Sequence, residues 1–395
     1  MYIYILSLSS FLWLLLGFAR NPYPVYCRFL QLLNSLDHRC RMMGTIADHE
    51  VHYADNKKIH YLASGPVKGP LIIFVHGWPA TAITWKAQLD AFAAVGFRAI
   101  APDMPGYGQS TARRVIDDYC LEALVEGMMA LLADIGRKAA IWVGHDWGSA
   151  VTSSVTIHHP EAVKALVSEN VPYASIELGW NGFLPTIDRE IYPADEYEYG
   201  QWDYMKLYEE DFEKAVAWFD SDVVGICKAF LQEKRAPPNR AEPTITCRAR
   251  KNGWLDGLPK PPSYDQTGPP TLPPDVFDSF VSDMQRTTFW PGSAYYLHHK
   301  RNAEYNGNRD LRLTKPALFV HGQWDLVCET KTSRLAENMR EVCSNLTEVT
   351  IDAGHFSQFD KPREFNAALM RFILEEVQTE WPGFWDSGYV KKPSV

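Results

Sequence analysis

The residues best suited to chemistry lie in a turn, GHDWG (residues 144–148), that follows the apolar run AAIWV. An apolar strand that enters a G-x-X-x-G turn before a helix is typical of a nucleophile elbow. Such an elbow holds one side chain exposed above the end of a buried strand. That side chain is Asp146 here. A carboxylate that attacks an electrophilic carbon forms an ester, so the turn predicts covalent catalysis by an aspartate.

Three other polar segments follow short apolar runs. HGWP (residues 76–79) comes after PLIIFV, Asp325 comes after PALFV, and His355 comes after LTEVTI. Doubly wound sheets bind ligands beyond the carboxyl ends of their strands, so we expect these segments to meet Asp146 there. The order nucleophile, acid, histidine accompanies a nucleophile elbow. Asp146, Asp325 and His355 are therefore the predicted catalytic triad.

The elements that position these residues alternate along the chain. EVHYAD and KKIHYLASG predict two paired strands around an Asp55-Asn56 turn, and PLIIFV, FRAIA and AAIWV predict buried strands. Helical patterns over about 82–95 and 118–136 lie between them. This alternation indicates an α/β fold, with a parallel sheet covered by helices on both faces.

The alternation stops near Pro172 and resumes with PALFV at residues 316–320. The intervening residues are rich in aromatic side chains and proline, which predicts a mainly helical lid inserted into one core domain. The expected parts are an N-terminal hydrophobic segment (1–42), a first core part (43–172), the lid (173–312), a second core part (313–378) and a tail (379–395).

The chain resembles the epoxide hydrolases of the α/β-hydrolase superfamily over about residues 48–378. The matching segments are HGWP (76–79), PDMPGYGQS (102–110), GHDWG (144–148), HGQWD (321–325) and AGHF (353–356). The resemblance implies a mostly parallel eight-stranded sheet with a helical lid after the sixth strand. It also implies conversion of an epoxide to a vicinal diol. The sequence has no G-x-G-x-x-G or P-loop motif, and His298-His299 has no second metal-ligand pair nearby, so no cofactor and no metal ion are expected.

The resemblance implies a two-step reaction. Asp146 attacks an epoxide carbon, and it needs no help from His355 because a carboxylate is already ionised near neutral pH. His355 then takes a proton from the water that hydrolyses the ester, while Asp325 orients the imidazole. The backbone N–H groups of Trp78 and Trp147 are the predicted oxyanion donors.

Ring opening also requires a proton for the epoxide oxygen. A tyrosine, with a pKa of about 10, is protonated at neutral pH and suits this role. The resemblance implies two lid tyrosines, Tyr204 in GQWDYMKLY and Tyr296 in WPGSAYYLHH. Tyr208 is an alternative to the first. The second segment departs from the family pattern, so the choice between Tyr295 and Tyr296 stays open.

The predicted substrate-binding residues are Trp78, Pro79, Trp147 and Tyr295, and the resemblance places Pro79 in a cis peptide bond. The expected partners are water and a small apolar epoxide, such as a xenobiotic, fatty-acid or terpenoid epoxide, because the lid is aromatic. The formal charge of −9 provides no basic face for a nucleic-acid partner.

Two alternatives remain open at the level of sequence. A dehalogenase of the same superfamily would use the same triad of Asp146, Asp325 and His355, with N–H donors for the leaving halide. HGWP and the lid tyrosines favour the epoxide hydrolase. The second alternative is a catalytically inactive scaffold, which the complete triad disfavours.

The N-terminal segment predicts a membrane anchor. Residues 1–19 contain no charged side chain and are about long enough to cross a bilayer. The basic residues that follow predict that the catalytic domain faces the cytoplasm; they are Arg20, Arg28, Arg39 and Arg41. The alternative is that translation starts at Met42 or Met43, which would give a cytoplasmic protein.

Overall fold

The computed structural model describes residues 45–232 and 242–382. The chain divides into two units, Met1–Thr45 and Ile46–Val395, and the fold belongs to the second. The predicted anchor at residues 1–19 lies outside the described residues, as does most of the predicted tail. Within residues 45–232 and 242–382, no helix combines the length and apolar character needed to cross a membrane.

Eight strands of the described residues form one sheet in the order β1-β2-β4-β3-β5-β6-β7-β8. β1–β2 and β2–β4 are antiparallel, and all later pairs are parallel. The strands are β1 (Ala47–Tyr53), β2 (Lys57–Ser64), β3 (Leu71–Val75), β4 (Arg98–Pro102), β5 (Ala140–His145), β6 (Val163–Glu169), β7 (Ala317–Gly322) and β8 (Leu346–Ile351). The predicted mostly parallel, eight-stranded sheet is confirmed.

Local chemistry explains the first hairpin. Asp55 and Asn56 adopt left-handed backbone conformations, with φ of 57° and 58°. Asp and Asn tolerate this region better than most residues, which makes them suitable for a tight turn. β1 therefore pairs with β2 in register from Ala47–Ala63 to Tyr53–Lys57, as the alternating sequence predicted.

The sheet has an apolar core on each face. Ile72 and Phe74 of β3 point into one core, while Ile73 and Val75 point into the other. This alternation explains why the strand is apolar at every position. The helices are α3 (Lys86–Ala94) and α16 (Pro362–Glu376) on the first face, and α4 (Leu121–Asp134) and α5 (Trp147–His158) on the second.

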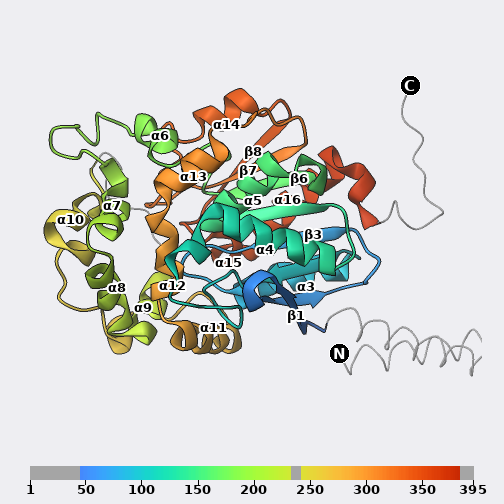
Figure 1. Cartoon of the computed structure of the whole chain (residues 1–395), viewed down its shortest axis with the longest axis horizontal. Coiled ribbons are helices and arrows are strands. Elements are labelled where there is room, and N and C mark those ends of the chain that lie inside the picture. Colours follow the sequence, from blue (N-terminus) through green and yellow to red (C-terminus); the bar gives the residue numbers. More distant parts are fainter. Residues whose placement is uncertain (1–44, 233–241, 383–395) are drawn as a thin grey trace, which may run out of the picture. The chain divides into compact units, whose positions relative to one another are not determined.

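The segment between β6 and β7 contains helices and no strand among its described residues. Its helices are α6 (Trp180–Phe183), α7 (Asp203–Glu210), α8 (Phe212–Asp220), α9 (Val223–Phe230), α10 (Ala249–Asn252), α11 (Pro274–Thr287), α12 (Trp290–Ser293) and α13 (His299–Asn306). In Figure 1, α7 to α10 form a group beside the sheet, and α13 contacts α4 and α5 of the core. A helical insertion after the sixth strand is thus confirmed. α14 (Glu337–Val342) and α15 (Ser357–Asp360) follow β7 and β8 respectively.

Candidate active site

The turn between β5 and α5 has the geometry of a nucleophile elbow. Asp146 lies between them with φ of 54° and ψ of −125°, a conformation that is strained for a residue with a side chain. The flanking glycines permit the turn. A Cβ on Gly144 would lie 2.5 Å from the Gly148 carbonyl oxygen, and a Cβ on Gly148 would lie 2.1 Å from the Val75 carbonyl oxygen. Only glycine fits at either place.

The two carboxylate oxygens of Asp146 have different environments. The backbone N–H of Trp78 donates a hydrogen bond of 2.7 Å to Oδ1. Oδ2 lies 3.5 Å from Nε2 of His355. The loop that carries Trp78 contains a cis Trp78–Pro79 peptide bond, as the family resemblance implied. The loop packs tightly on the elbow, because a Cβ on Gly77 would lie 2.4 Å from Asp146 Oδ1.

His355 lies between two carboxylates. Its Nδ1 is 3.1 Å from each carboxylate oxygen of Asp325. Burial lowers the pKa of His355, but the carboxylates of Asp325 and Asp146 outweigh burial and raise that pKa well above 6.5. The pKa of Asp325 is lowered despite its burial, because His355 and the backbone N–H groups of Val327 and Cys328 stabilise its charge. The imidazole is therefore held in a fixed orientation.

Two tyrosine side chains from the lid face the triad. Tyr204 belongs to α7, and Tyr296 belongs to a 3-10 turn over Ala294–Leu297. Their ring centroids are 5.8 Å apart, and both side chains line the same cavity. Burial, followed by neighbouring groups that include Asp146, raises both pKa values well above 10. Both phenols are therefore protonated at neutral pH and can donate a proton.

A cavity of about 480 Å³ joins the triad to the lid. Asp146, Asp325 and His355 lie in its wall, together with Tyr204 and Tyr296. The other aromatic or apolar lining residues include Trp78, Pro79, Tyr208, Phe219, Phe230, Trp254 and Phe356. Trp78 and Pro79 are thus placed where substrate-binding residues were expected. The volume suits a small or medium-sized organic ligand.

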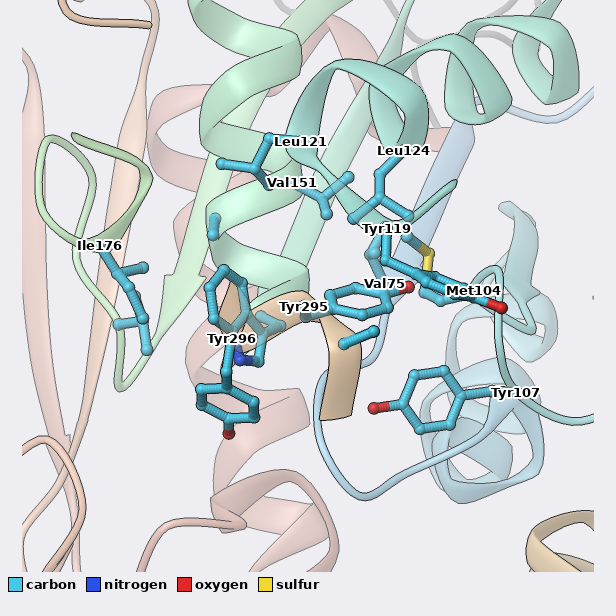
Figure 2. Close-up of a cluster of buried hydrophobic side chains, with 14 of the residues drawn as sticks. Val75, Met104, Tyr107, Tyr119, Leu121, Leu124, Val151, Ile176, Tyr295 and Tyr296 are labelled. Atoms are coloured by element: carbon cyan, nitrogen blue, oxygen red, sulfur yellow. The ribbon is translucent and has the colours of Figure 1, made fainter. Parts of the chain in front are cut away.

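Two expected substrate-binding side chains lie elsewhere, and these expectations are corrected. The hydroxyl of Tyr295 donates a hydrogen bond of 2.7 Å to the Pro105 carbonyl, away from the cavity. Figure 2 shows Tyr295 directed toward Tyr119, whereas Tyr296 points in another direction. The indole of Trp147 is buried against Tyr295 and Tyr296 and is not among the cavity-lining residues. Both side chains pack against residues outside the cavity lining.

A buried polar network that the sequence did not reveal fixes the histidine loop. The His355 carbonyl accepts a hydrogen bond of 2.7 Å from His145 Nε2 and one of 2.6 Å from Asn170 Nδ2. Asn170 Oδ1 also accepts the N–H of Gly322 at 2.6 Å, at the end of β7. One amide thus joins the histidine loop to the strand that precedes Asp325. Asn170 follows β6 directly, and no local sequence pattern singles it out.

Glu169 supports the same loop from the last position of β6. Its Oε1 accepts hydrogen bonds from the hydroxyl of Ser357 and, at 3.0 Å, from the N–H of Gln358. Burial raises the pKa of Glu169 to about 8, although these two hydrogen bonds lower it. Glu169 is therefore a largely protonated carboxyl at neutral pH, placed behind the residues that follow His355.

The fold and the elbow define the class of protein. Residues 70–362 match the family described as the alpha/beta hydrolase fold. Because this match covers most of the chain, the protein belongs to that family.

Within the family, the chain is similar to epoxide hydrolases. It is 28% identical to epoxide hydrolase A of Mycobacterium tuberculosis, over 80% of this chain and 94% of the relative. It is 26% identical to bifunctional epoxide hydrolase 2 of Rattus norvegicus, over 81% of this chain but only 54% of that longer relative. A crystal structure of epoxide hydrolase A from Mycobacterium thermoresistibile superposes with a TM-score of 0.67 at 28% identity, covering 84% of this chain and 99% of the other.

Proposed function

We propose that this protein is an epoxide hydrolase, which opens an epoxide to a vicinal diol through an ester of Asp146. One observation carries the proposal: a single cavity holds the Asp146 carboxylate, the His355–Asp325 pair and two tyrosine hydroxyls. The similarity to several epoxide hydrolases supports it.

The first step is attack by Asp146 Oδ2. Oδ1 is bonded to the Trp78 N–H, so Oδ2 is the oxygen left to attack an epoxide carbon. A new carbon–oxygen bond forms while the epoxide carbon–oxygen bond breaks. The proton that the departing alkoxide needs comes from Tyr204 or Tyr296, whose high pKa values keep them protonated until an alkoxide forms.

The second step is hydrolysis of the ester by water that His355 activates. Before the reaction, the charge of Asp146 helps to raise the pKa of His355. Ester formation removes that charge, so the pKa of the imidazole falls; Nε2 gives its proton to the tyrosinate left by ring opening and can then accept a proton from water. Water then attacks the carboxyl carbon, and the developing oxyanion stays at the Trp78 N–H. When the ester carbon–oxygen bond breaks, the leaving diol oxygen takes the proton of the new carboxyl group, which restores the Asp146 carboxylate. Asp325 stabilises the imidazolium that forms.

The substrate class follows from the cavity wall. The cavity wall is mainly apolar, and it includes the aromatic side chains of Phe219, Phe230 and Trp254 of the insertion. We infer that residues 173–312 act as a lid that selects small apolar epoxides. No step of this reaction uses a cofactor or a metal ion.

The test uses product analysis. Styrene oxide should yield the diol, and Asp146→Ala should abolish turnover. A single turnover in ¹⁸O-labelled water should leave the label in Asp146 and give an unlabelled diol, because the diol oxygen comes from the carboxylate. Label that enters the diol in the first turnover would show direct attack by water and refute the ester mechanism.

The dehalogenase alternative has less support. A leaving halide needs N–H donors that face it; the indole of Trp147 is not in the cavity lining, which leaves Trp78 as the indole from beside the nucleophile that lines the cavity. Incubation with 1-chlorobutane separates the two activities. Chloride release without diol formation from styrene oxide would favour the dehalogenase.

Membrane association is a separate proposal that rests on sequence alone. Residues 1–19 carry no charged side chain, and we propose that they anchor the chain with its catalytic domain toward the cytoplasm. N-terminal sequencing of the protein from native membranes tests this proposal. A start at Met42 or Met43 would contradict it.

A further inference from the structure

The thiol of Cys328 lies beside two members of the triad, so that three side chains of different chemistry converge. Asp325, Cys328 and His355 each offer one potential metal-ligand atom, and these atoms all lie within 4.8 Å of one another. All three residues are buried, with exposed fractions of 2%, 4% and 6% respectively. The proposed reaction uses Asp325 and His355 but assigns no role to the Cys328 thiol.

A carboxylate, a thiolate and an imidazole form a donor set that suits zinc. Zn²⁺ binds sulfur, nitrogen and oxygen ligands in tetrahedral sites, whereas Mg²⁺ and Ca²⁺ require mostly oxygen ligands. Cd²⁺, a softer ion of the same charge, also favours thiolate. We propose that Asp325, Cys328 and His355 form an inhibitory site for Zn²⁺ and chemically similar ions. Its inhibitory effect rests on the proposed function, while metal binding itself does not.

The geometry requires little rearrangement. Zinc bonds to nitrogen and oxygen of about 2.0–2.2 Å place two tetrahedral ligands roughly 3.4 Å apart. The Asp325 oxygens are already 3.1 Å from His355 Nδ1. The sulfur of Cys328 must approach by at most roughly 1.2 Å, since it lies within 4.8 Å of the other two ligand atoms and a tetrahedral zinc site needs about 3.6 Å. Binding replaces the proton shared by Asp325 and His355 and releases the thiol proton of Cys328.

The site also has an entry path and a place for a fourth ligand. Asp325 and His355 line the cavity of about 480 Å³, so an ion can reach them by the substrate route. Water from that cavity would complete the tetrahedron. With zinc bound to Nδ1, the neutral imidazole keeps its single proton on Nε2, so Nε2 cannot accept a proton from water. Ester hydrolysis would then stop and the Asp146 ester would accumulate.

The experiment titrates the full-length protein with Zn²⁺ and measures both bound metal and diol formation. The wild type should bind one Zn²⁺ at this site and lose diol formation reversibly, with activity restored by EDTA. Cys328→Ala should retain diol formation without metal and need at least tenfold more Zn²⁺ for inhibition. Cys343→Ala, which alters another buried cysteine, is the matched control and should behave like the wild type.

A second measurement does not depend on catalysis. Cd²⁺ bound to a thiolate produces an ultraviolet charge-transfer absorption, expected in the wild type and Cys343→Ala but lost in Cys328→Ala. The same absorption in Cys328→Ala, or Zn²⁺ sensitivity equal to the wild type in that variant, would overturn the site. If the wild type shows the Cd²⁺–thiolate absorption but hydrolyses no epoxide, the proposed function is rejected while the metal site is supported.

Discussion

Asn170→Ala is the most informative single substitution, because one side chain holds two of the three triad segments. The amide bonds to the His355 carbonyl and to the Gly322 N–H at 2.6 Å each. Alanine would remove both bonds. It would also have to adopt the left-handed φ of 61° that Asn170 has now.

The expected loss of stability can be worked out group by group. The Gly322 N–H would be left buried without a partner, which costs about 1–3 kcal/mol. The His355 carbonyl keeps its bond from His145, so losing the second bond costs only about 0.5–1.5 kcal/mol. An alanine at positive φ adds about 1–2 kcal/mol. The free energy of unfolding should therefore fall by about 2.5–6.5 kcal/mol.

The kinetic effect should be specific to ester hydrolysis. Asn170 does not contact Asp146, so the first step should change little, whereas a shift of His355 by about 1 Å can slow its chemistry about 10²-fold. The assay combines urea unfolding with quenched single turnovers, in which mass spectrometry measures the fraction of Asp146 esterified. Asn170→Ala should accumulate ester that the wild type does not.

Asn306→Ala provides the matched control. Asn306 is also a fully buried asparagine, and its amide donates to the Glu177 and Asn302 carbonyls at 2.9 and 3.2 Å and contacts His158. Its loss should destabilise the protein similarly without ester accumulation. Equal ester levels in the two variants, at a temperature where both are folded, would refute the positioning role of Asn170.

Three further predictions follow from the same site. Tyr296→Phe should lower the rate of ester formation by about 10²-fold or more, since general acid catalysis has that size. Tyr295→Phe should leave this rate unchanged and lower only thermal stability; similar rates in both variants would reject the assignment. His355→Gln should form ester without hydrolysing it, detected as added mass on the Asp146 peptide, and normal turnover by this variant would exclude the mechanism. Glu169→Gln should gain stability relative to the wild type as pH rises from about 5 to 8. The reason is that Glu169 has a pKa raised to about 8 in the folded state, so the folded wild type binds more protons than the unfolded chain in this range and loses stability. Urea unfolding at several pH values measures the free energy of unfolding of both proteins. The same pH dependence in the two proteins would contradict the prediction.

Much of this site could be predicted because strand ends are visible in sequence. Asp146, Asp325 and His355 each follow an apolar run, and parallel strands bring their carboxyl ends to one edge of the sheet. The turn chemistry of Asp55 and Asn56 is equally local. The structure places all of these residues where local patterns and topology expected them.

The remaining features depend on side-chain directions and long-range contacts. Tyr295 and Tyr296 are neighbours in a short 3-10 turn, and only the packing of Tyr295 against the core decides which hydroxyl faces the cavity. The bonds from Asn170 to His355 and Gly322 join residues 185 and 152 positions apart, which no local pattern encodes. The prediction that Trp147 binds substrate was wrong because the backbone of Trp147, and not its indole, lies at the elbow.

In the elbow, the residues that position the nucleophile differ from the residue that determines the type of reaction. Its backbone is set by Gly144 and Gly148, which admit no side chain, and by the strand and helix on either side. The identity of the central residue does not enter that geometry. Evolution can therefore exchange the nucleophile at position 146 without rebuilding the scaffold, whereas a change at either glycine would remove the site altogether.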